Sequence, residues 1–121
     1  MSDIEKVSYV DFVNSLVKPA DDIFQEVSAK DMGLIHMIMG ICGEAGELLD
    51  AVKKHVIYKK PLDLENVVEE LGDIEFYLEG FRQELNILRD STIEHNMNKL
   101  SKRYHQGRYT NNQAIDRADK E

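Results

Sequence analysis

Two pairs of acidic residues with helical spacing stand out in the middle of the chain. Glu44 and Glu47 lie three residues apart in "GEAGELLDAVKKH", and Glu70 and Asp73 repeat that spacing in "ENVVEELGDIEFYL". Because an α-helix advances about 100° per residue, the two members of each pair fall on one side of a helix. Carboxylates crowded beside an apolar core repel one another and need a proton or a cation. Oxygen ligands of this kind suit Mg²⁺, with Mn²⁺ as a second candidate, so the two pairs predict a metal site.

A downstream segment carries an amide and two cations on one side of another predicted helix, beside its apolar stripe as the acids are beside theirs. Asn96, Lys99 and Arg103 share one side of "NMNKLSKRY". A metal bound by the acids can recruit a triphosphate, and these cations, with Lys53 or Lys54, would offset the charge that remains. Bound metal can also deprotonate a water and polarise the phosphoryl group that the water attacks. The set therefore predicts hydrolysis of a nucleotide.

The elements that position these residues are predicted to be helices, because helical periodicity runs through almost the whole chain. The capping pair Ser28 and Asp31 begins the long central helix, and Asp63 begins the next one. The expected helices cover residues 9–18, about 21–29, 28–57, 63–88, and from Asp90 or Ser91 to Tyr104. The fold class is an all-α bundle of about four to five helices. Residues 1–121 are expected to form one domain, with a core at about 30–104 and a loosely ordered polar tail at 105–121.

The two acid-bearing helices are expected to show matching surfaces. Their predicted apolar stripes are Ile41, Ala45, Leu48 and Val52 in one helix and Val67, Leu71, Ile74 and Leu78 in the other. Each acidic pair then lies on the shoulder of its stripe. Gly46 and Gly72 each precede the second acid of a pair, and a glycine there lets a backbone or a ligand come close.

Charge and composition narrow the function. A formal net charge of −8 argues against a nucleic-acid partner, which needs a Lys/Arg surface. Cys42 is the single cysteine, which favours a reducing compartment and a cytoplasmic location. The N-terminus "MSDIEKVSYV" lacks the pattern of a secretory signal. The apolar run "GLIHMIMGIC" has about half the length that a membrane-spanning helix requires, so no membrane partner is expected.

These motifs resemble those of the MazG-like superfamily of all-α nucleoside triphosphate pyrophosphohydrolases. The signature of that family is an E-x-x-E pair followed, after a short loop, by an E-x-x-D pair, and Glu44, Glu47, Glu70 and Asp73 match all four positions. The likeness covers roughly residues 30–110 and includes the N-x-x-K-x-x-x-R string that begins at Asn96.

The resemblance implies cleavage of a nucleoside triphosphate, ribo- or deoxy-, to monophosphate and pyrophosphate. The four acids would bind Mg²⁺, and Glu47 or Glu44 would also accept the proton of the attacking water. By the same likeness, Asn96, Lys99, Arg103 and Tyr104 would contact phosphate, sugar or base. A homodimer or homotetramer and a role in cleaning or adjusting the nucleotide pool are implied as well.

Two other classes of protein are alternatives to this enzyme. A carboxylate-bridged di-iron bundle uses Glu-x-x-His pairs, and the sequence contains none. A non-catalytic helical module that binds nucleotides or a partner protein remains the alternative. Replacing Glu47 with Gln separates the two, because only the enzyme loses its turnover.

Overall fold

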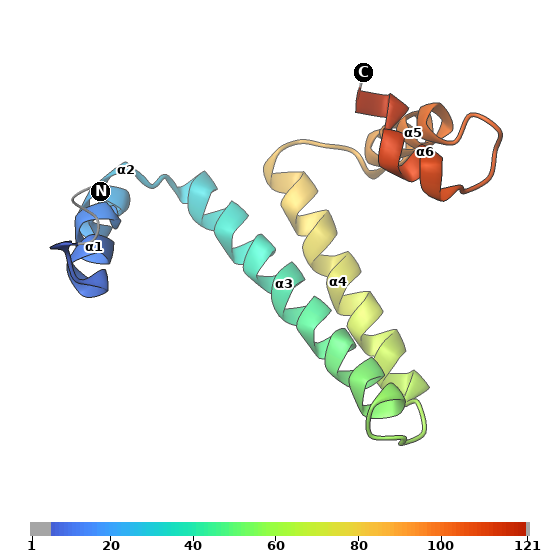
Figure 1. Cartoon of the computed structure of the whole chain (residues 1–121), viewed down its shortest axis with the longest axis horizontal. Coiled ribbons are helices and arrows are strands. Elements are labelled where there is room, and N and C mark those ends of the chain that lie inside the picture. Colours follow the sequence, from blue (N-terminus) through green and yellow to red (C-terminus); the bar gives the residue numbers. More distant parts are fainter. Residues whose placement is uncertain (1–5, 121) are drawn as a thin grey trace. The chain divides into compact units, whose positions relative to one another are not determined.

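The computed structural model describes residues 6–120 and shows helices without any strand in that range, which confirms the all-α class (Figure 1). The chain divides into two compact units, with the boundary between Met32 and Gly33. The first unit contains α1 (Tyr9–Leu16), α2 (Ala20–Glu26) and the first turn of α3. The second contains the rest of α3 (Ala29–Val56), α4 (Leu64–Glu84), α5 (Arg89–Arg103), α6 (Asn111–Asp116) and the short 3₁₀ helix η2 (Ala118–Lys120).

The helices of the first unit are short because turn signals end them early. The hydroxyl of Ser8 caps α1 by accepting the Asp11 N–H at 3.1 Å. α1 ends at Leu16, two residues earlier than predicted, since the residue before Pro19 is biased toward extended backbone. α2 ends at Glu26 rather than at about Ala29, which leaves Ser28 free to cap the next helix.

α3 and α4 begin at the caps that the sequence predicts. The Ser28 hydroxyl accepts the Asp31 N–H at 3.0 Å, and the Asp31 carboxylate accepts the Ser28 N–H at 3.1 Å. These two hydrogen bonds are the reciprocal pair of a capping box. The Asp63 carboxylate accepts the Asn66 N–H at 3.1 Å. Both central helices therefore start as the local sequence dictates.

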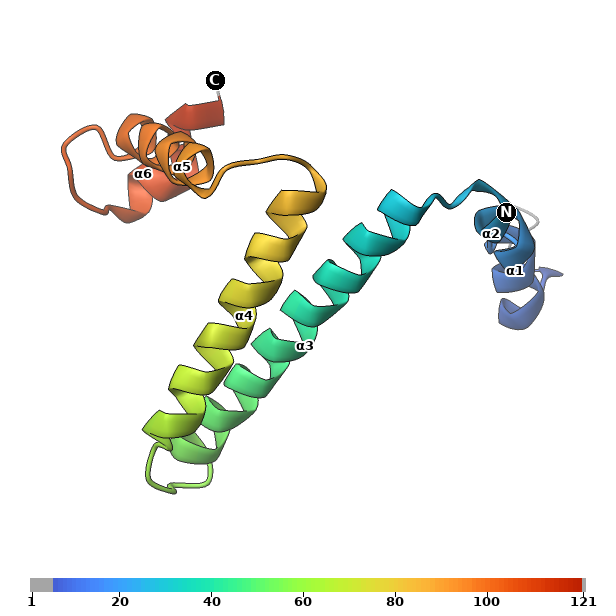
Figure 2. The ribbon, with the colours of Figure 1, turned by 180° about the vertical axis from the view of Figure 1, so that it is seen from behind.

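α3 and α4 run side by side in opposite directions, as Figures 1 and 2 both show. The contacts along the pair fix its register. A Cβ added at Gly40 would meet the Tyr77 ring, and one added at Gly80 would meet Met37. In these contacts a higher residue number on α3 is paired with a lower residue number on α4, which is the order of an antiparallel hairpin.

The seam of this hairpin passes through two of the acids. Its members repeat at alternating steps of three and four residues, the spacing of two helices packed along a coiled-coil seam. On α3 they are Leu34, Met37, Ile41, Glu44, Leu48 and Ala51, and on α4 Val67, Glu70, Ile74, Tyr77, Phe81 and Glu84. Ala51 is the one buried residue among those described, and the other seam residues are half-buried.

The predicted stripes are therefore correct in part. Ile41, Leu48, Val67, Ile74 and Leu78 are half-buried as expected. Ala45, Val52 and Leu71 are exposed instead, which corrects the prediction. Each helix carries two adjoining apolar stripes, and helical periodicity alone does not say which one faces the other helix.

Residues beside the seam form two contrasting sides of the hairpin. In an antiparallel pair, residues that directly precede seam positions on both helices fall on one side, and residues that directly follow them fall on the other. The same spacing extended by one step places His55 on α3 and Asp63 before α4 in line with the seam. With that extension, the first set, here called the polar side, includes Glu47, Asp50, Lys54, Asn66 and Asp73. The second, here called the apolar side, is Ala45, Leu49, Val52 and Val56 on α3 with Leu64, Val68 and Leu71 on α4, all of them exposed.

α4 ends at Glu84, four residues before the predicted end at Leu88. Asn86 has a left-handed φ of 56°. The Ile87 N–H donates to the Arg82 carbonyl at 2.9 Å, and the Asn86 N–H donates to the Gln83 carbonyl at 3.2 Å. This pair of hydrogen bonds is a Schellman C-cap, with asparagine in the place that glycine usually takes.

The C-terminal residues differ from the predicted loose tail. α5 begins at Arg89 after Leu88, so neither Asp90 nor Ser91 is its cap. The Thr110 hydroxyl caps α6 by accepting the Gln113 N–H at 3.1 Å. The Asp119 carboxylate on η2 then binds the Arg103 guanidinium on α5. A local cap and one ion pair thus order a segment whose polar composition gives no sign of structure.

α3 is long and apolar enough to cross a membrane when judged by length and composition alone. It has 28 residues, and its most apolar window has a mean hydropathy of 1.3. A core helix of a soluble protein passes the same test. One such helix is weak evidence for a membrane span.

Candidate metal centre

Three of the four predicted acids meet in one cluster across the α3–α4 seam. One carboxylate oxygen from each of Glu44, Glu70 and Asp73 lies within 4.8 Å of the other two. Glu44 and Glu70 are half-buried at facing seam positions, and Asp73 is exposed on the polar side. The antiparallel register produces this meeting, because it brings the middle of α3 level with the first half of α4.

The environment of Glu70 disfavours its charged form. The hydrogen bond with the Glu44 carboxyl, burial, and the charges of Glu44, Asp73 and Glu47 together raise the pKa of Glu70 to about 7. Its Oε2 atom is buried and has no hydrogen-bond partner among the described residues. A buried polar atom without a partner carries a desolvation penalty, which a proton or a cation removes.

The donor set fits a hard divalent cation. Three carboxylates converge from two helices, one oxygen of Glu70 lacks a partner, and Asp73 leaves the cluster open toward solvent. Mg²⁺ and Mn²⁺ prefer oxygen ligands and commonly keep several waters. Among the described residues, Glu44, Glu70 and Asp73 could thus hold such an ion.

Glu47 lies outside the three-carboxylate cluster but close enough to act on it. It is exposed on the polar side, one helical turn from Glu44. Its negative charge is one of the causes that raise the pKa of Glu70, and it also raises the pKa of Lys54 after the larger effect of Asp50. Glu47 therefore lies between the acidic cluster and Lys54 along α3.

Lys54 has a carboxylate partner on its own helix. Its Nζ lies 2.8 Å from the Asp50 carboxylate, an i,i+4 pair in which both side chains are about half exposed. Such pairs on a helix surface contribute little stability, so the ammonium can exchange partners at small cost.

The four predicted substrate-binding residues of α5 have different surroundings. The Arg103 guanidinium donates two hydrogen bonds to Asp119, at 2.7 and 3.2 Å, and the Asp119 side chain is 1% exposed. Lys99 is half-buried. Asn96 and Tyr104 line a cavity of about 340 Å³ with Arg108 and Tyr109 among its other walls. Asp119 was not predicted from the sequence, because an aspartate 16 residues downstream has no periodic relation to α5.

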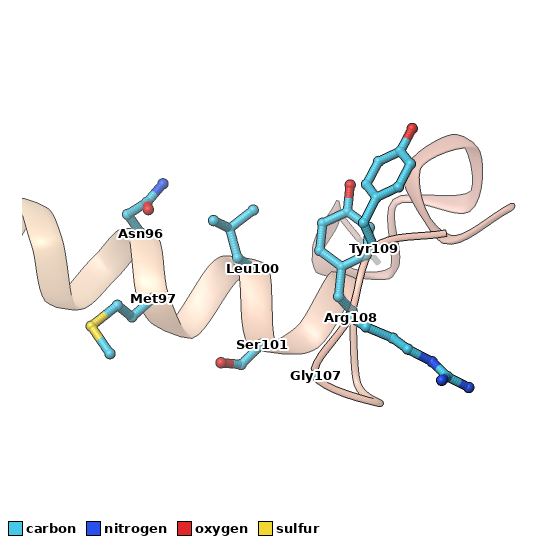
Figure 3. A pocket seen from close by; sticks show the side chains of 8 residues that line it. Asn96, Met97, Leu100, Ser101, Gly107, Arg108 and Tyr109 are labelled. Carbon is cyan, nitrogen blue, oxygen red and sulfur yellow. The ribbon is translucent and has the colours of Figure 1, made fainter. Parts of the chain in front are cut away.

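Figure 3 shows this α5 cavity from close by. The Tyr109 ring stands near the end of α5, and its centroid lies 5.4 Å from that of Tyr104 at an angle of 43°. Arg108 extends away from Asn96 and Leu100. The cavity therefore has aromatic and aliphatic walls with one amide at its edge.

Comparison with known proteins identifies the family of most of this chain. The family model described as the MazG nucleotide pyrophosphohydrolase domain matches residues 33–107, more than half of the chain. The chain is also similar to the Gene 37 protein of Mycobacterium phage L5, with 32% identity over 79 residues that cover 62% of this chain and 69% of the phage protein. No solved structure shows a significant match. The matched region contains both acidic pairs and all of α4 and α5, and the chain belongs to the MazG nucleotide pyrophosphohydrolase family.

Proposed function

We propose that this protein is a Mg²⁺-dependent hydrolase that cleaves ribo- or deoxynucleoside triphosphates to monophosphate and pyrophosphate. One observation carries the proposal: Glu44, Glu70 and Asp73 converge within 4.8 Å around a buried Glu70 oxygen that lacks a partner. Membership in a family of nucleotide pyrophosphohydrolases supplies the reaction class.

Each acid has a distinct part in the proposed mechanism. Glu44, Glu70 and Asp73 would hold the cation, which would supply Lewis-acid polarisation of the phosphoryl group and a lowered pKa for a water. Glu47 is exposed beside them and accepts the proton as the water oxygen attacks the α-phosphorus. The bond from that phosphorus to the bridging oxygen then breaks, and pyrophosphate leaves. We assign the base to Glu47 rather than to Glu44, because Glu44 is a member of the cluster.

The remaining predicted residues bind the substrate in this proposal. Lys54 lies on the same side of the hairpin as Glu47 and offers positive charge to phosphate. Asn96 and Tyr104 line one cavity on α5 and suit the sugar or the base. Lys99 and Arg103 suit phosphate, and Arg103 exchanges one of its two bonds to Asp119 when it does so.

The apolar side of the hairpin supports assembly with a second copy. Leu49, Leu64 and Val68 are 66–69% exposed there, and their spacing continues the pattern of a second helix seam. Two hairpins that pair through this side form a four-helix core, because each copy supplies two helices. We propose a homodimer as the minimal unit, with a homotetramer as a pair of such dimers.

The setting of the proposed enzyme is the cytoplasm, where nucleoside triphosphates are found and where Cys42 stays reduced. Its role there is to clean or adjust the nucleotide pool. The net charge of −8 disfavours a nucleic-acid substrate, so free nucleotides are the expected partners.

A nucleotide panel tests the proposal. Purified protein is incubated with ribo- and deoxynucleoside triphosphates, with and without Mg²⁺, and the products are resolved. We expect Mg²⁺-dependent release of monophosphate and pyrophosphate from at least one nucleotide. Diphosphate with orthophosphate would contradict α–β cleavage, and no product from any nucleotide would favour the non-catalytic binding module.

Two substitutions separate the proposed roles of the acids. Glu47→Gln should lower kcat by about 10²–10⁴-fold, the range of general base catalysis, while Mn²⁺ affinity stays within a few fold. Asp73→Asn should weaken Mn²⁺ binding, which a paramagnetic titration measures directly. Glu75→Gln, an exposed acid of α4 outside the cluster, is the control and should match the wild type in both measurements. Full turnover in Glu47→Gln would exclude Glu47 as the base.

A further inference from the structure

A second cavity on the polar side of the hairpin has no assigned role. It has a volume of about 300 Å³ and lies where α3, the connecting loop and α4 meet. Its lining residues are Ala51, Lys54, Lys60, Pro61, Asp63 and Asn66. Only Lys54 among them was expected from the sequence to contact a substrate.

The cavity adjoins the acidic cluster along both helices. Asn66 precedes Glu70 by four residues, and Ala51 follows Glu47 by four, so both lie about 6 Å along a helix axis from an acid. Lys54 and Asn66 belong to the polar side, as Glu47 and Asp73 do. The cavity therefore continues the surface on which the cation would be held.

The charge of the cavity is unusual for this acidic protein. Its lining includes two lysines and an asparagine, Lys54, Lys60 and Asn66. Its one carboxylate, that of Asp63, already accepts the Asn66 N–H at the start of α4. Among residues 6–120 no acid lies within ion-pair distance of Lys60. The lining residues thus carry one net positive charge beside a cluster of negative charge, and the Asp50 carboxylate outside the lining pairs with Lys54.

The backbone around Lys60 is fixed by its neighbours. The Lys60 N–H donates to the Lys54 carbonyl at 3.2 Å, and the Lys60 carbonyl lies 2.7 Å from His55 Nδ1. Lys59 has a left-handed φ of 59°, which turns the chain back toward α3. These contacts hold Lys60 against the end of α3 and beside Lys54.

The opposite direction along the polar side has different chemistry. Phe76 follows Asp73 by three residues, is 67% exposed, and lines a cavity of about 590 Å³ with Met37 and Gly80. The other lining residues are polar, Glu79, Gln83 and Glu84. Apolar and acidic groups therefore flank the cluster toward one end of the hairpin, and lysines flank it toward the other. A triphosphate held at the acids therefore has its most favourable electrostatic interaction when its terminal phosphates point to the lysines.

We propose that the cavity of Lys54, Lys60 and Asn66 binds the terminal phosphates of the substrate and then the pyrophosphate product. This inference rests on the proposed function, because it assigns the two ends of the same substrate. Lys60 and Asn66 are its new ligands. The ammonium of Lys60 contacts phosphate oxygens as a point charge, and the Asn66 amide donates a hydrogen bond.

Calorimetric titration of the full chain with pyrophosphate, with and without Mg²⁺, tests the cavity directly. Lys60→Gln should weaken binding by about tenfold, as expected for loss of a charge-assisted hydrogen bond. Lys59→Gln removes the same charge from a neighbour that does not line this cavity, and it should bind as the wild type does.

Asn66→Asp is a second variant, chosen because the substitution should not disturb folding. The residue lies in the first turn of α4, where an acid favours the helix, so the fold should be retained while the new charge repels phosphate. We expect about tenfold weaker pyrophosphate binding and a raised KM in this variant, with Mn²⁺ affinity not reduced.

The outcomes distinguish this inference from the proposed function. Equal pyrophosphate affinity in the wild type, Lys60→Gln and Asn66→Asp would overturn the cavity assignment, even if the wild type hydrolyses nucleotides. Absence of hydrolysis in the wild type would overturn the proposed function. In that case pyrophosphate binding that Lys60→Gln weakens would still support an anion site, and no binding at all would overturn it.

Discussion

Glu70 is the residue whose surroundings differ most from those of an ordinary surface acid. It faces Glu44 across the seam, and its pKa is raised to about 7 from an ordinary value of 4.5. The Glu44 hydrogen bond is the largest cause, followed by burial and by the charges of Glu44, Asp73 and Glu47. In the folded protein without metal, Glu70 therefore keeps its proton up to a higher pH than it does in the unfolded chain.

This proton makes the stability of the metal-free protein depend on pH. Between about pH 4.5 and 7 the folded state binds more protons at Glu70 than the unfolded state does, so stability falls as pH rises through this window. The contribution is fully present below pH 4.5. We expect the Tm in EDTA to fall over this range in the wild type and to fall less in Glu70→Gln, which stays neutral. The same slope in both proteins would contradict the assignment.

At the scale of elements, the glycines of α3 and α4 divide into two groups. Gly40 lies against the Tyr77 ring, whereas Gly46 and Gly72 have no neighbouring atom within 4 Å of the position that a Cβ would take. Glycine inside a helix lowers stability by about 0.5–1 kcal/mol relative to alanine. The absence of a side chain at Gly40 therefore allows the two helices to pack. No contact within the described chain requires a glycine at the other two positions.

Alanine substitutions should separate these groups by sign. Gly40→Ala should destabilise the protein by about 1–3 kcal/mol, because the new methyl group overpacks the seam. Gly46→Ala and Gly72→Ala should each stabilise the isolated fold by about 0.5–1 kcal/mol. Denaturant unfolding measures all three. A loss of assembly or of Mg²⁺-dependent turnover in Gly46→Ala, with the fold intact, would show instead that a partner backbone or ligand approaches there.

At the scale of the whole molecule, the apolar side of the hairpin is the largest unexplained feature of the fold. Ala51 is the one buried residue in the described part of the chain, so the helices bury little apolar surface by themselves. Monomeric soluble proteins rarely expose contiguous apolar patches of this kind. In the proposed homodimer, a second copy that covers this side would supply the core that one copy lacks.

Val68→Glu tests this assembly, because it places a charge at the centre of the proposed contact. We expect the wild type to sediment as a dimer or tetramer and Val68→Glu to shift toward the monomer. Burial of an unpaired charge is strongly unfavourable. Gln83→Glu adds the same charge at an exposed position on the other side of α4 and should leave the mass unchanged. A monomeric wild type would contradict the proposed homodimer.

The sequence by itself determined the helical class, the caps at Ser28 and Asp63 and the family to which the chain belongs. Those features depend on local hydrogen bonds and on residue spacing, which one chain displays directly. It also indicated that the two acidic pairs would converge. The sequence does not predict the end of α4 at Glu84, because the residue that stops the helix is Asn86, and asparagine adopts the left-handed conformation less regularly than glycine does.

The tertiary structure decided which side of each helix faces its neighbour. It moved the seam onto Glu44 and Glu70, left Glu47 outside the cluster, and gathered Lys60 and Asn66 beside Lys54. These facts depend on the register between two helices, and that register is set by the fit of Tyr77 against Gly40 and Met37 against Gly80. The periodicity of one helix shows which residues share a side of that helix. Only the packing of two helices decides which of those sides face each other and so form the candidate site.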